Sequence, residues 1–463
     1  MIGLGFLYFF LPVFTALYLV SPKQIKSRLV LLSGAGLICY ADPVGLILMG
    51  VCILSGYLFG VFIHNFREKP AGRVLVGLSI AVNFAAFLLF HRTAYDGSDL
   101  LTVIGKQSIL KNTALVGASL MPFHSIAYCV DVYRKKYVCD HKFIRVAEYI
   151  AFFPCFAAGP ILRFDRVRRE MEEPKVSAEK SAAGIRMLML GLFMKLFISN
   201  TMYELWNDVR DIPVRSLPAL SAWIGILAFA FFVFFELSAF SYMASGLASL
   251  MGIRVPRNFR EPYRATGFFD FCRRFNCTVY RWCVDYIYRS IKRSGEGLFC
   301  DLLAVTISLI VAMLWYGFSL RTVVFGAAFM LMLCLEKILK KPLNKLPTPV
   351  KRLLFLFLLM VILPFLAFSS PMEAVQYIAA MFGGSNVAVD TTSEYLFGTY
   401  FLFVVICLLI SSGVSGYIFK KKVFSNEYLQ TVIQPVWVIA LLIFCTAILV
   451  SGDSGSYMYI YMF

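Results

Sequence analysis

Long apolar runs separated by short polar connectors form the pattern of this chain from its first residues to its last. A helix needs about 20 apolar residues to cross the roughly 30 Å of hydrocarbon in a bilayer. Runs of that order lie at residues 6–20, 29–62, 74–90, 113–129, 144–162, 184–199, 219–240, 298–313, 323–339, 353–368, 396–419 and 431–450. The 29–62 run is long enough for two passes. The pattern therefore predicts an all-α, polytopic integral membrane protein with roughly 11–14 membrane helices and re-entrant segments.

Composition supports the same class of protein. Hydrophobic residues make up 60% of the chain and charged residues only 15%, which is too little polar surface to cover a water-soluble fold of this length. We find no internal repeat and no long flexible linker, so we expect a single integral membrane domain over residues 1–463.

The basic residues that give the chain its net charge of +17 lie mostly in the connectors between the apolar runs. Basic clusters lie at residues 23–28, 67–73, 134–145, 163–180, 254–293, 337–352 and 420–422. Lysine and arginine favour cytoplasmic loops and attract anionic lipid headgroups, so this distribution argues for a membrane partner and against nucleic acid. We expect a multi-pass protein of the cell membrane with residues 23–28 and 420–422 in the cytoplasm, residues 369–395 outside, and both termini extracytoplasmic.

Cysteine and histidine usage offers no metal site. The twelve cysteines mostly lie within apolar runs, and no Cys-x-x-Cys pair accompanies a histidine cluster. Only four histidines are present: His64, His91, His124 and His141. We therefore predict neither a bound metal nor a bound cofactor.

Two polar features interrupt the apolar pattern. Glu236 lies inside an apolar run, where a carboxylate is costly unless it is paired, so it is a candidate for a functional or structural polar contact. Residues 254–293 are too polar to span lipid, yet they are rich in aromatic and arginine side chains. Such a segment either lies in the membrane interface or lines a cavity inside the protein.

Several motifs, in order along nearly the whole chain, resemble those of one family. They are Phe9-Phe10-Leu11-Pro12, the stretch from Gly117 to Arg134 with Tyr128 and Asp131-Val132-Tyr133, Phe152-Phe153-Pro154, Ala158-Gly159-Pro160-Ile161-Leu162-Arg163, Phe235-Glu236, Gly252 to Pro256, Asn258-Phe259, Pro262-Tyr263, Ala380 to Gly384 and the aromatic tail 457–463. The chain resembles the bacterial polysaccharide-modifying branch of the membrane-bound O-acyltransferases (MBOAT). That branch includes alginate O-acetyltransferases and the proteins of teichoic acid D-alanylation.

The resemblance implies a central funnel across the membrane, where an acyl thioester donor, acyl-CoA or an acyl carrier protein, meets an acceptor hydroxyl of a polysaccharide or teichoic acid. It also implies N-terminal helices over residues 1–110, a core with the funnel over 111–345 and C-terminal helices over 346–463. The family histidine of Trp-His-Gly stands where this chain has Trp315-Tyr316-Gly317. The second histidine follows an Arg-Arg-Trp triplet, which here reads Arg273-Arg274-Phe275, and its place is taken by Asn276.

A third departure falls in the family's Tyr-Ser-Asp-Met-Ala segment, where Tyr242 replaces the acid. Acyl transfer to a hydroxyl needs a base, and histidine suits because its pKa of about 6.5 lies near the working pH. Tyrosine titrates near pH 10 and asparagine does not titrate usefully. Tyr316 and Asn276 are thus the catalytic positions, occupied by poor bases.

The remaining candidates have two interpretations each. His124 is either a helix-packing residue or a replacement base. Arg273 and Arg274 either lie at the membrane interface or pair with Asp270, Asp285 or donor phosphates.

The aromatic candidates are equally open. Tyr280 and Trp315 are either interface or core aromatics, or part of a substrate wall.

These residues leave three functional hypotheses. The first is an MBOAT-family protein with lost or reduced catalysis, a pseudoenzyme that pairs with an active acyltransferase or an extracytoplasmic esterase-like partner. The second is an active O-acyltransferase with a rewired site, moving an acetyl-like acyl group to a surface polysaccharide. The third, a transporter or lipid scrambler on the same funnel, lacks the acids that would couple ions.

Overall fold

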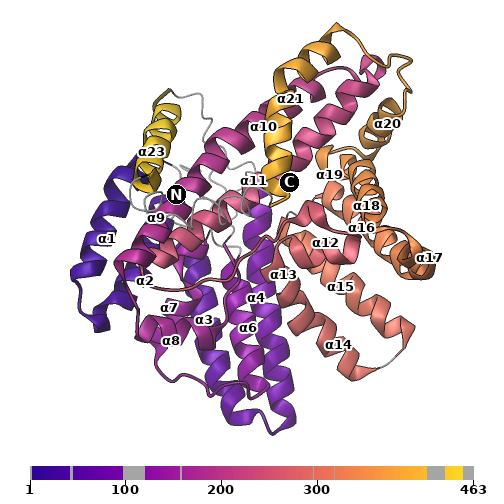
Figure 1. Cartoon of the computed structure of the whole chain (residues 1–463). Coiled ribbons are helices and arrows are strands. Elements are labelled where there is room, and N and C mark those ends of the chain that lie inside the picture. The colour runs from indigo at the N-terminus through magenta and orange to yellow at the C-terminus, as the bar shows by residue number, and fades with distance from the viewer. Residues whose placement is uncertain are drawn as a thin grey trace. The chain divides into compact units, whose positions relative to one another are not determined.

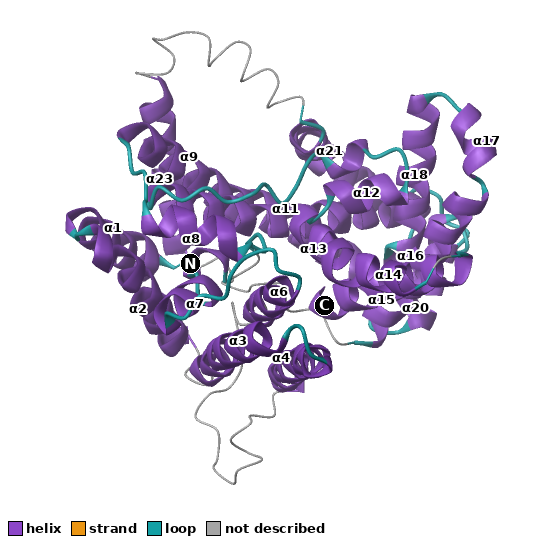
Figure 2. Ribbon diagram, turned by 90° about the horizontal axis from the view of Figure 1, so that it is seen from below, coloured by secondary structure: helices purple, strands orange, loops and turns teal. Residues whose placement is uncertain are grey.

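The computed structural model describes residues 3–41, 45–96, 120–156, 159–295, 297–316, 319–413 and 433–451. Within these ranges every regular element is a helix, as Figure 2 shows. The predicted all-α class is confirmed. Several features from the sequence lie outside the described residues: the start of the 113–129 run, Ala158, Gly317, the basic group 420–422 and the tail 457–463.

The described helices fall into two compact units, which are treated separately below. The first comprises Met1–Leu188 with Phe240–Arg257, and the second Met189–Ala239 with Asn258–Phe463. This grouping does not test the predicted divisions at residues 110 and 345, which stay predictions.

Helices of the first unit come mostly from the N-terminal part of the chain (Figure 1). They are α1 (Leu11–Val20), α2 (Lys23–Ala41), α3 (Gly45–Phe66), α4 (Pro70–Asp96), α6 (Met121–Tyr133), α7 (Phe143–Ile150), α8 (Phe164–Glu172), most of α9 (Ala178–Phe193) and the end of α11 (Ala219–Leu250).

The second unit holds the end of α9, most of α11, and α10 and the helices after α11. They are α10 (Asn200–Arg210), α12 (Phe268–Arg274), α13 (Cys277–Trp282), α14 (Arg289–Ser294), α15 (Leu298–Tyr316), α16 (Leu320–Ile338), α17 (Lys340–Lys345), α18 (Thr348–Ile362), α19 (Pro364–Ala367), α20 (Pro371–Met381), α21 (Thr391–Ser411) and α23 (Gln434–Ser451). Two π-helical turns belong here as well, Met194–Ser199 and Cys283–Tyr288.

Seven helices in the described residues are long and apolar enough to cross a membrane. They are Gly45–Phe66, Pro70–Leu88, Ala178–Arg210, Ala219–Leu250, Thr348–Ala367, Thr391–Ser411 and Gln434–Ser451. Two shorter apolar helices, Phe6–Val20 and Cys300–Tyr316, accompany them. The chain is therefore a multi-pass membrane protein, as its apolar pattern predicts.

One apolar run does not form a continuous helix. The 144–162 run begins as α7, but that helix ends at Ile150 and is followed by a single 3-10 turn over Phe153–Cys155. Pro154 lies in this turn and has no backbone N–H with which to continue a helical ladder. Apolar composition alone could not show this break.

Aromatic packing forms the core of the second unit. Trp206 of α10 is fully buried, and its ring lies 5.1 Å from Phe229 of α11, 5.5 Å from Phe368 and 5.8 Å from Tyr377 of α20. The Tyr377 hydroxyl donates a 2.8 Å hydrogen bond to the carbonyl oxygen of Ala222. These contacts fix α11 as a rigid wall of the unit.

Within the first unit, α9 and α11 approach at two glycines. A Cβ added to Gly246 would lie 2.7 Å from the carbonyl oxygen of Gly184, and one added to Gly184 would lie 2.8 Å from that of Gly246. Small residues let membrane helices pack backbone to backbone, where dispersion rather than a hydrophobic driving force holds them together.

We expect Gly246→Ala to lower the thermal unfolding midpoint, because the new methyl group would force the two backbones apart. Gly77→Ala in α4 is the matched control, since a Cβ at Gly77 meets nothing within 4 Å. Its midpoint should stay the same or rise, because alanine favours helix. Thermal unfolding of the two purified variants measures this. Equal midpoints would contradict the packing described for α9 and α11.

Candidate functional site

Asn276 and Tyr316, where the sequence resemblance predicts the family histidines, lie side by side in the second unit. Tyr316 is the last residue of α15, and Asn276 lies between α12 and α13. The Nδ2 of Asn276 donates a 3.1 Å hydrogen bond to the hydroxyl of Tyr316, although 40 residues separate them in sequence. Both residues line one cavity.

The backbone at Asn276 is left-handed, with φ 50° and ψ 57°. Asparagine, aspartate and histidine adopt this conformation more readily than other residues with a side chain. Asn258 anchors the residues just after Asn276, at the start of α13. Its carbonyl oxygen accepts from the Cys277 amide at 2.7 Å, and its Oδ1 accepts from the Thr278 amide and hydroxyl at 3.1 and 2.8 Å.

Glu336 of α16 anchors the start of α12, the helix that precedes Asn276. The Oε2 of Glu336 accepts from the backbone amides of Phe268 at 2.5 Å and Phe269 at 3.3 Å, the first residues of α12. No side chain within the segment itself caps this helix. A carboxylate at a helix N-terminus satisfies amides that lack a partner and complements the helix dipole. Glu336 thus supplies the cap from a different helix.

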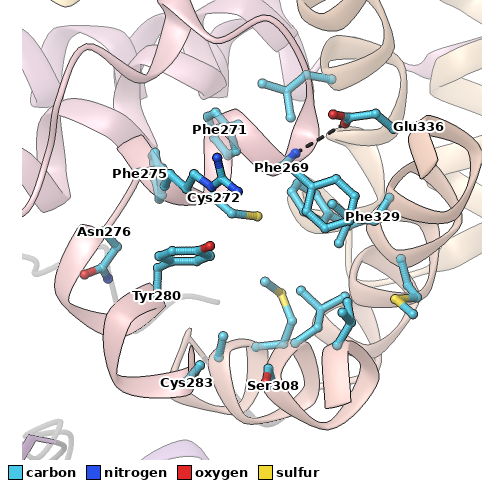
Figure 3. Close-up of a pocket in the computed structure, with 18 of the residues that line it drawn as sticks. Phe269, Phe271, Cys272, Phe275, Asn276, Tyr280, Cys283, Ser308, Phe329 and Glu336 are labelled. Atoms are coloured by element: carbon cyan, nitrogen blue, oxygen red, sulfur yellow. Dashed lines mark hydrogen bonds between the residues drawn. The ribbon is translucent and has the colours of Figure 1, made fainter. Parts of the chain in front are cut away.

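The cavity has a volume of about 820 Å³ and lies within the second unit. Figure 3 shows aromatic side chains from α12 and the turn after it around the opening, with Glu336 joined to the α12 backbone and Ser308 extending from α15. The opposite walls come from α15 and α16. Residues 254–293 therefore line a cavity, one of the two alternatives that their composition left open.

Arg273 and Tyr280 also line the cavity. A side-chain hydrogen bond with Tyr280 raises the pKa of Arg273, so its guanidinium stays a cation. Arg274 instead pairs with Asp270, Nε to Oδ1 at 2.9 Å, which confirms one of the predicted arginine pairings. Neither Arg274 nor Asp270 is among the described residues that line the cavity.

Trp315 is buried behind Tyr316, with its ring centroid 4.8 Å from that of the tyrosine in an edge-on arrangement. It is not among the described cavity-lining residues. Its position favours support of Tyr316 over direct contact with a bound molecule.

His124 belongs to the first unit. Its Nε2 accepts a 3.1 Å hydrogen bond from the Leu162 amide, and its ring lies 5.1 Å from that of Tyr149. These contacts are those of a packing histidine, and its role as a replacement base stays a prediction. Tyr242, which the resemblance places where the family has an acidic residue, also belongs to the first unit, and its side chain is 43% exposed.

Glu236 lies on the face of α11 that lines the cavity, with Ala230 and Val233. Its Oε2 accepts from Lys195 Nζ at 2.8 Å and from Ser199 Oγ at 2.7 Å. The Lys195 and Glu236 side chains are 2% and 0% exposed. Both Lys195 and Ser199 belong to the π-helical turn Met194–Ser199, a type of distortion that is frequent at functional sites.

Three cysteines line the cavity, Cys272, Cys283 and Cys334. Burial raises the pKa of the Cys272 and Cys283 thiols to about 12, so both stay protonated at neutral pH. A protonated thiol is a poor nucleophile and not a base. These two thiols are therefore poor candidates for the group that would take a proton in acyl transfer.

At one end of the cavity wall the side chains are basic. Lys337, Lys340 and Lys351 line it together with Asp301, which pairs with Lys292 at 2.9 Å and with Lys337 at 3.6 Å. Arginine and lysine at a cavity suit an anionic group such as a phosphate.

Glu336, Lys195 and Ser308 were not singled out from the sequence, and Asn258 was noted only as part of the Asn258-Phe259 motif. Lys195 carried the same signal that drew attention to Glu236, a lone charge in an apolar run. Glu336 is followed by Lys337 near the end of its run, and Ser308 is a single uncharged polar residue, so neither gave such a signal.

Gly267 precedes α12, and a Cβ there would lie 2.5 Å from the Oε1 of Glu336. We expect Gly267→Ala and Glu336→Ala each to lower the free energy of unfolding by about 1 kcal/mol, since either change removes the helix cap. The double variant should lose little more than either single one, because both changes break the same contact. Chemical unfolding of the purified protein measures all three.

Glu373→Ala is the matched control, because Glu373 is an exposed acid in the first turn of α20. Its effect should stay within about 0.5 kcal/mol. Additive losses in the double variant would show that Glu336 and Gly267 act independently.

Comparisons with known proteins identify the family of this chain. A family model described as MBOAT, membrane-bound O-acyltransferase family, covers residues 108–378, more than half of the chain. The chain is 28% identical over 340 residues to the probable alginate O-acetylase AlgI of Pseudomonas aeruginosa, which is 72% of this chain and 65% of that protein. The chain thus spans less than two thirds of that relative's length.

More distant relatives modify other envelope polymers. The peptidoglycan O-acetyltransferase of Helicobacter pylori is 23% identical over 51% of this chain and 50% of its own length. The teichoic acid D-alanyltransferase of Bacillus subtilis is 23% identical over 51% of this chain and 58% of its own length. With the family model covering the cavity, Asn276 and Tyr316 alike, the chain belongs to the membrane-bound O-acyltransferase family.

Proposed function

We propose that this chain acts in the acylation of a cell-envelope polymer or exopolysaccharide and that its own catalysis is lost or much reduced. The observation that carries the proposal is the 3.1 Å contact between Asn276 and Tyr316 on the wall of the cavity. No histidine is found among the described residues that line this cavity. The site keeps polar groups at both family positions but has no base there.

Having tyrosine and asparagine in place of histidine would slow acyl transfer greatly. Attack of a hydroxyl on a thioester carbonyl needs a group that takes the proton as the oxygen attacks, and such a group contributes about 10²–10⁴ in rate. The Tyr316 hydroxyl and the Asn276 amide exchange hydrogen bonds without titrating near neutral pH. They can orient a carbonyl group, and they leave the proton on the acceptor.

An acyl thioester, acyl-CoA or an acyl carrier protein, is the donor class that fits the cavity. The apolar walls from α15 and α16 suit an acyl group, while Lys337, Lys340 and Arg273 suit the phosphates that such carriers bear. The names of the relatives support a polysaccharide or teichoic-acid-like acceptor. In the proposed arrangement the protein lies in the cell membrane with both termini outside.

A protein with this loss would work through a partner. An active acyltransferase with intact histidines, or an extracytoplasmic esterase-like protein, would supply the chemical step while this chain contributes its cavity. The large cavity around the substituted pair supports a retained binding role.

One observation favours the second candidate, an active transferase with a rewired site. Asn276 is buried, Tyr316 is partly buried, and the two are joined by a hydrogen bond at a cavity, which is how residues that orient a substrate carbonyl are held. In this alternative the Tyr316 hydroxyl donates to the carbonyl oxygen of the acyl group, and transfer proceeds slowly without a nearby base.

Restoring histidine at both positions tests the proposal. The left-handed backbone at Asn276 accommodates histidine, so Asn276→His with Tyr316→His should fold. We expect transfer of a radiolabelled acetyl group from acetyl-CoA to an alginate or teichoic acid acceptor to rise by about 10²–10⁴ over the unaltered chain. Asn276→Gln with Tyr316→Phe is the matched control, because it alters both positions without adding a base, and it should show no gain.

Rapid transfer by the unaltered chain that Tyr316→Phe abolishes would contradict lost catalysis and favour the rewired transferase. A double-histidine chain that folds and stays inactive would contradict the attribution of the loss to positions 276 and 316 alone, because the rest of the cavity would then be unsuited to transfer.

A further inference from the structure

Three polar atoms of cavity-lining residues are buried without a hydrogen-bond partner among the described residues. They are the Oε1 of Glu236, the hydroxyl oxygen of Ser308 and the Oδ1 of Asn276, whose Nδ2 already pairs with Tyr316. Buried polar atoms are nearly always hydrogen-bonded, and an unpaired one costs about 1–3 kcal/mol. Their position on a cavity indicates that a molecule bound there completes their hydrogen bonding.

The geometry of Glu236 separates its two oxygens. Lys195 and Ser199 both bind Oε2, and neither of them is among the residues that line the cavity. Glu236 itself lines the cavity from the same face of α11 as Ala230 and Val233. Lys195 and Ser199 thus occupy Oε2, and Oε1 is the oxygen of this cavity-lining residue that a bound molecule could pair with.

Ser308 faces the same space from α15. Val305, Ser308, Ala312 and Tyr316 line the cavity at intervals of three or four residues, which is one face of a helix. Figure 3 shows the Ser308 side chain extending into the opening. Glu236 and Ser308 thus present an acceptor and a hydroxyl to one cavity that also holds Asn276.

The charges around Glu236 narrow the class of ligand. A carboxylate oxygen only accepts, so the ligand must donate a hydrogen bond. The Lys195 ammonium 2.8 Å away already balances the carboxylate and would repel a second cation, while the carboxylate would repel a phosphate placed against it. A neutral hydroxyl satisfies both conditions.

We propose that Glu236 and Ser308 form a subsite that binds the hydroxyl groups of the acceptor, a saccharide or a polyol, and so determine which acceptor enters the cavity. The proposal rests on the envelope-polymer function above. Lys195 and Ser199 are positioning residues, since they hold Glu236 by its other oxygen.

The test uses the full chain in lipid nanodiscs and measures binding by calorimetry. One probe is a neutral hexose oligosaccharide and the other an oligomer of glycerol phosphate, which separates a sugar source of the hydroxyls from a polyol source. We expect the unaltered chain to bind at least one probe, and Ser308→Ala to raise its Kd about tenfold, the effect of one lost hydrogen bond.

Glu236 needs a paired variant, because removing it alone would leave Lys195 as an uncompensated buried charge. Lys195→Met with Glu236→Leu removes both charges together and should fold. Its Kd should also rise at least about tenfold. Ser238→Ala is the matched control. Ser238 also lies on α11, and its hydroxyl is likewise buried without a partner among the described residues. It is not among the described residues that line the cavity. Its Kd should not change.

Failure of both probes to bind the unaltered chain would overturn the subsite, as would Ser308→Ala and Lys195→Met/Glu236→Leu variants that bind as tightly as Ser238→Ala. This outcome is separate from the acyl-transfer test. If the double-histidine chain transfers acyl groups while the binding variants behave like the control, the proposed function stands and the subsite is wrong. If binding weakens as expected and no transfer is restored, the subsite stands and the lost-histidine explanation is wrong.

Discussion

The site depends on how a short, broken stretch of backbone satisfies its polar groups inside an apolar protein. Helices α12 and α13 are seven and six residues long, too short to be stable alone. Glu336 caps the first amides of α12, and Asn258 takes the first amides of α13. Between these two anchors the chain turns through a left-handed residue, Asn276. Without both anchors, nothing would hold that side chain against Tyr316.

The contact between Asn276 and Tyr316 is a pair of neutral polar groups where an acyl-transfer site needs a titrating one. Its energy is modest, about 0.5–1.5 kcal/mol for a neutral hydrogen bond. In the proposed function its effect on mechanism is larger, because the pair keeps hydrogen-bonding groups at the site and supplies no proton acceptor. The proposal thus separates binding from chemistry in this cavity: the apolar walls, the cations and Glu236 would serve binding, while Asn276 and Tyr316 would limit the chemistry.

Sequence patterns predicted the fold class well, because lipid demands long apolar helices and leaves few alternatives. They were weaker wherever one residue breaks a run: Pro154 ends helical structure inside an apolar stretch. At the site, the 40-residue separation of Asn276 and Tyr316 hides their contact from any local pattern, and only the resemblance to a family drew attention to both. Glu336 was missed because its role, capping a helix 68 residues away, is visible only in three dimensions.

Three carboxylates line this cavity, and they differ in whether they have an oxygen left for a ligand. Glu336 is occupied by the chain itself, since its Oε2 accepts from two amides of α12. Asp301 is likewise engaged, by Lys292 and Lys337. Lys195 and Ser199 bind only the Oε2 of Glu236, and its Oε1 has no partner among the described residues. Because the cost of that orphaned oxygen falls when a hydroxyl binds, the arrangement favours an occupied cavity over an empty one, whether or not acyl transfer follows.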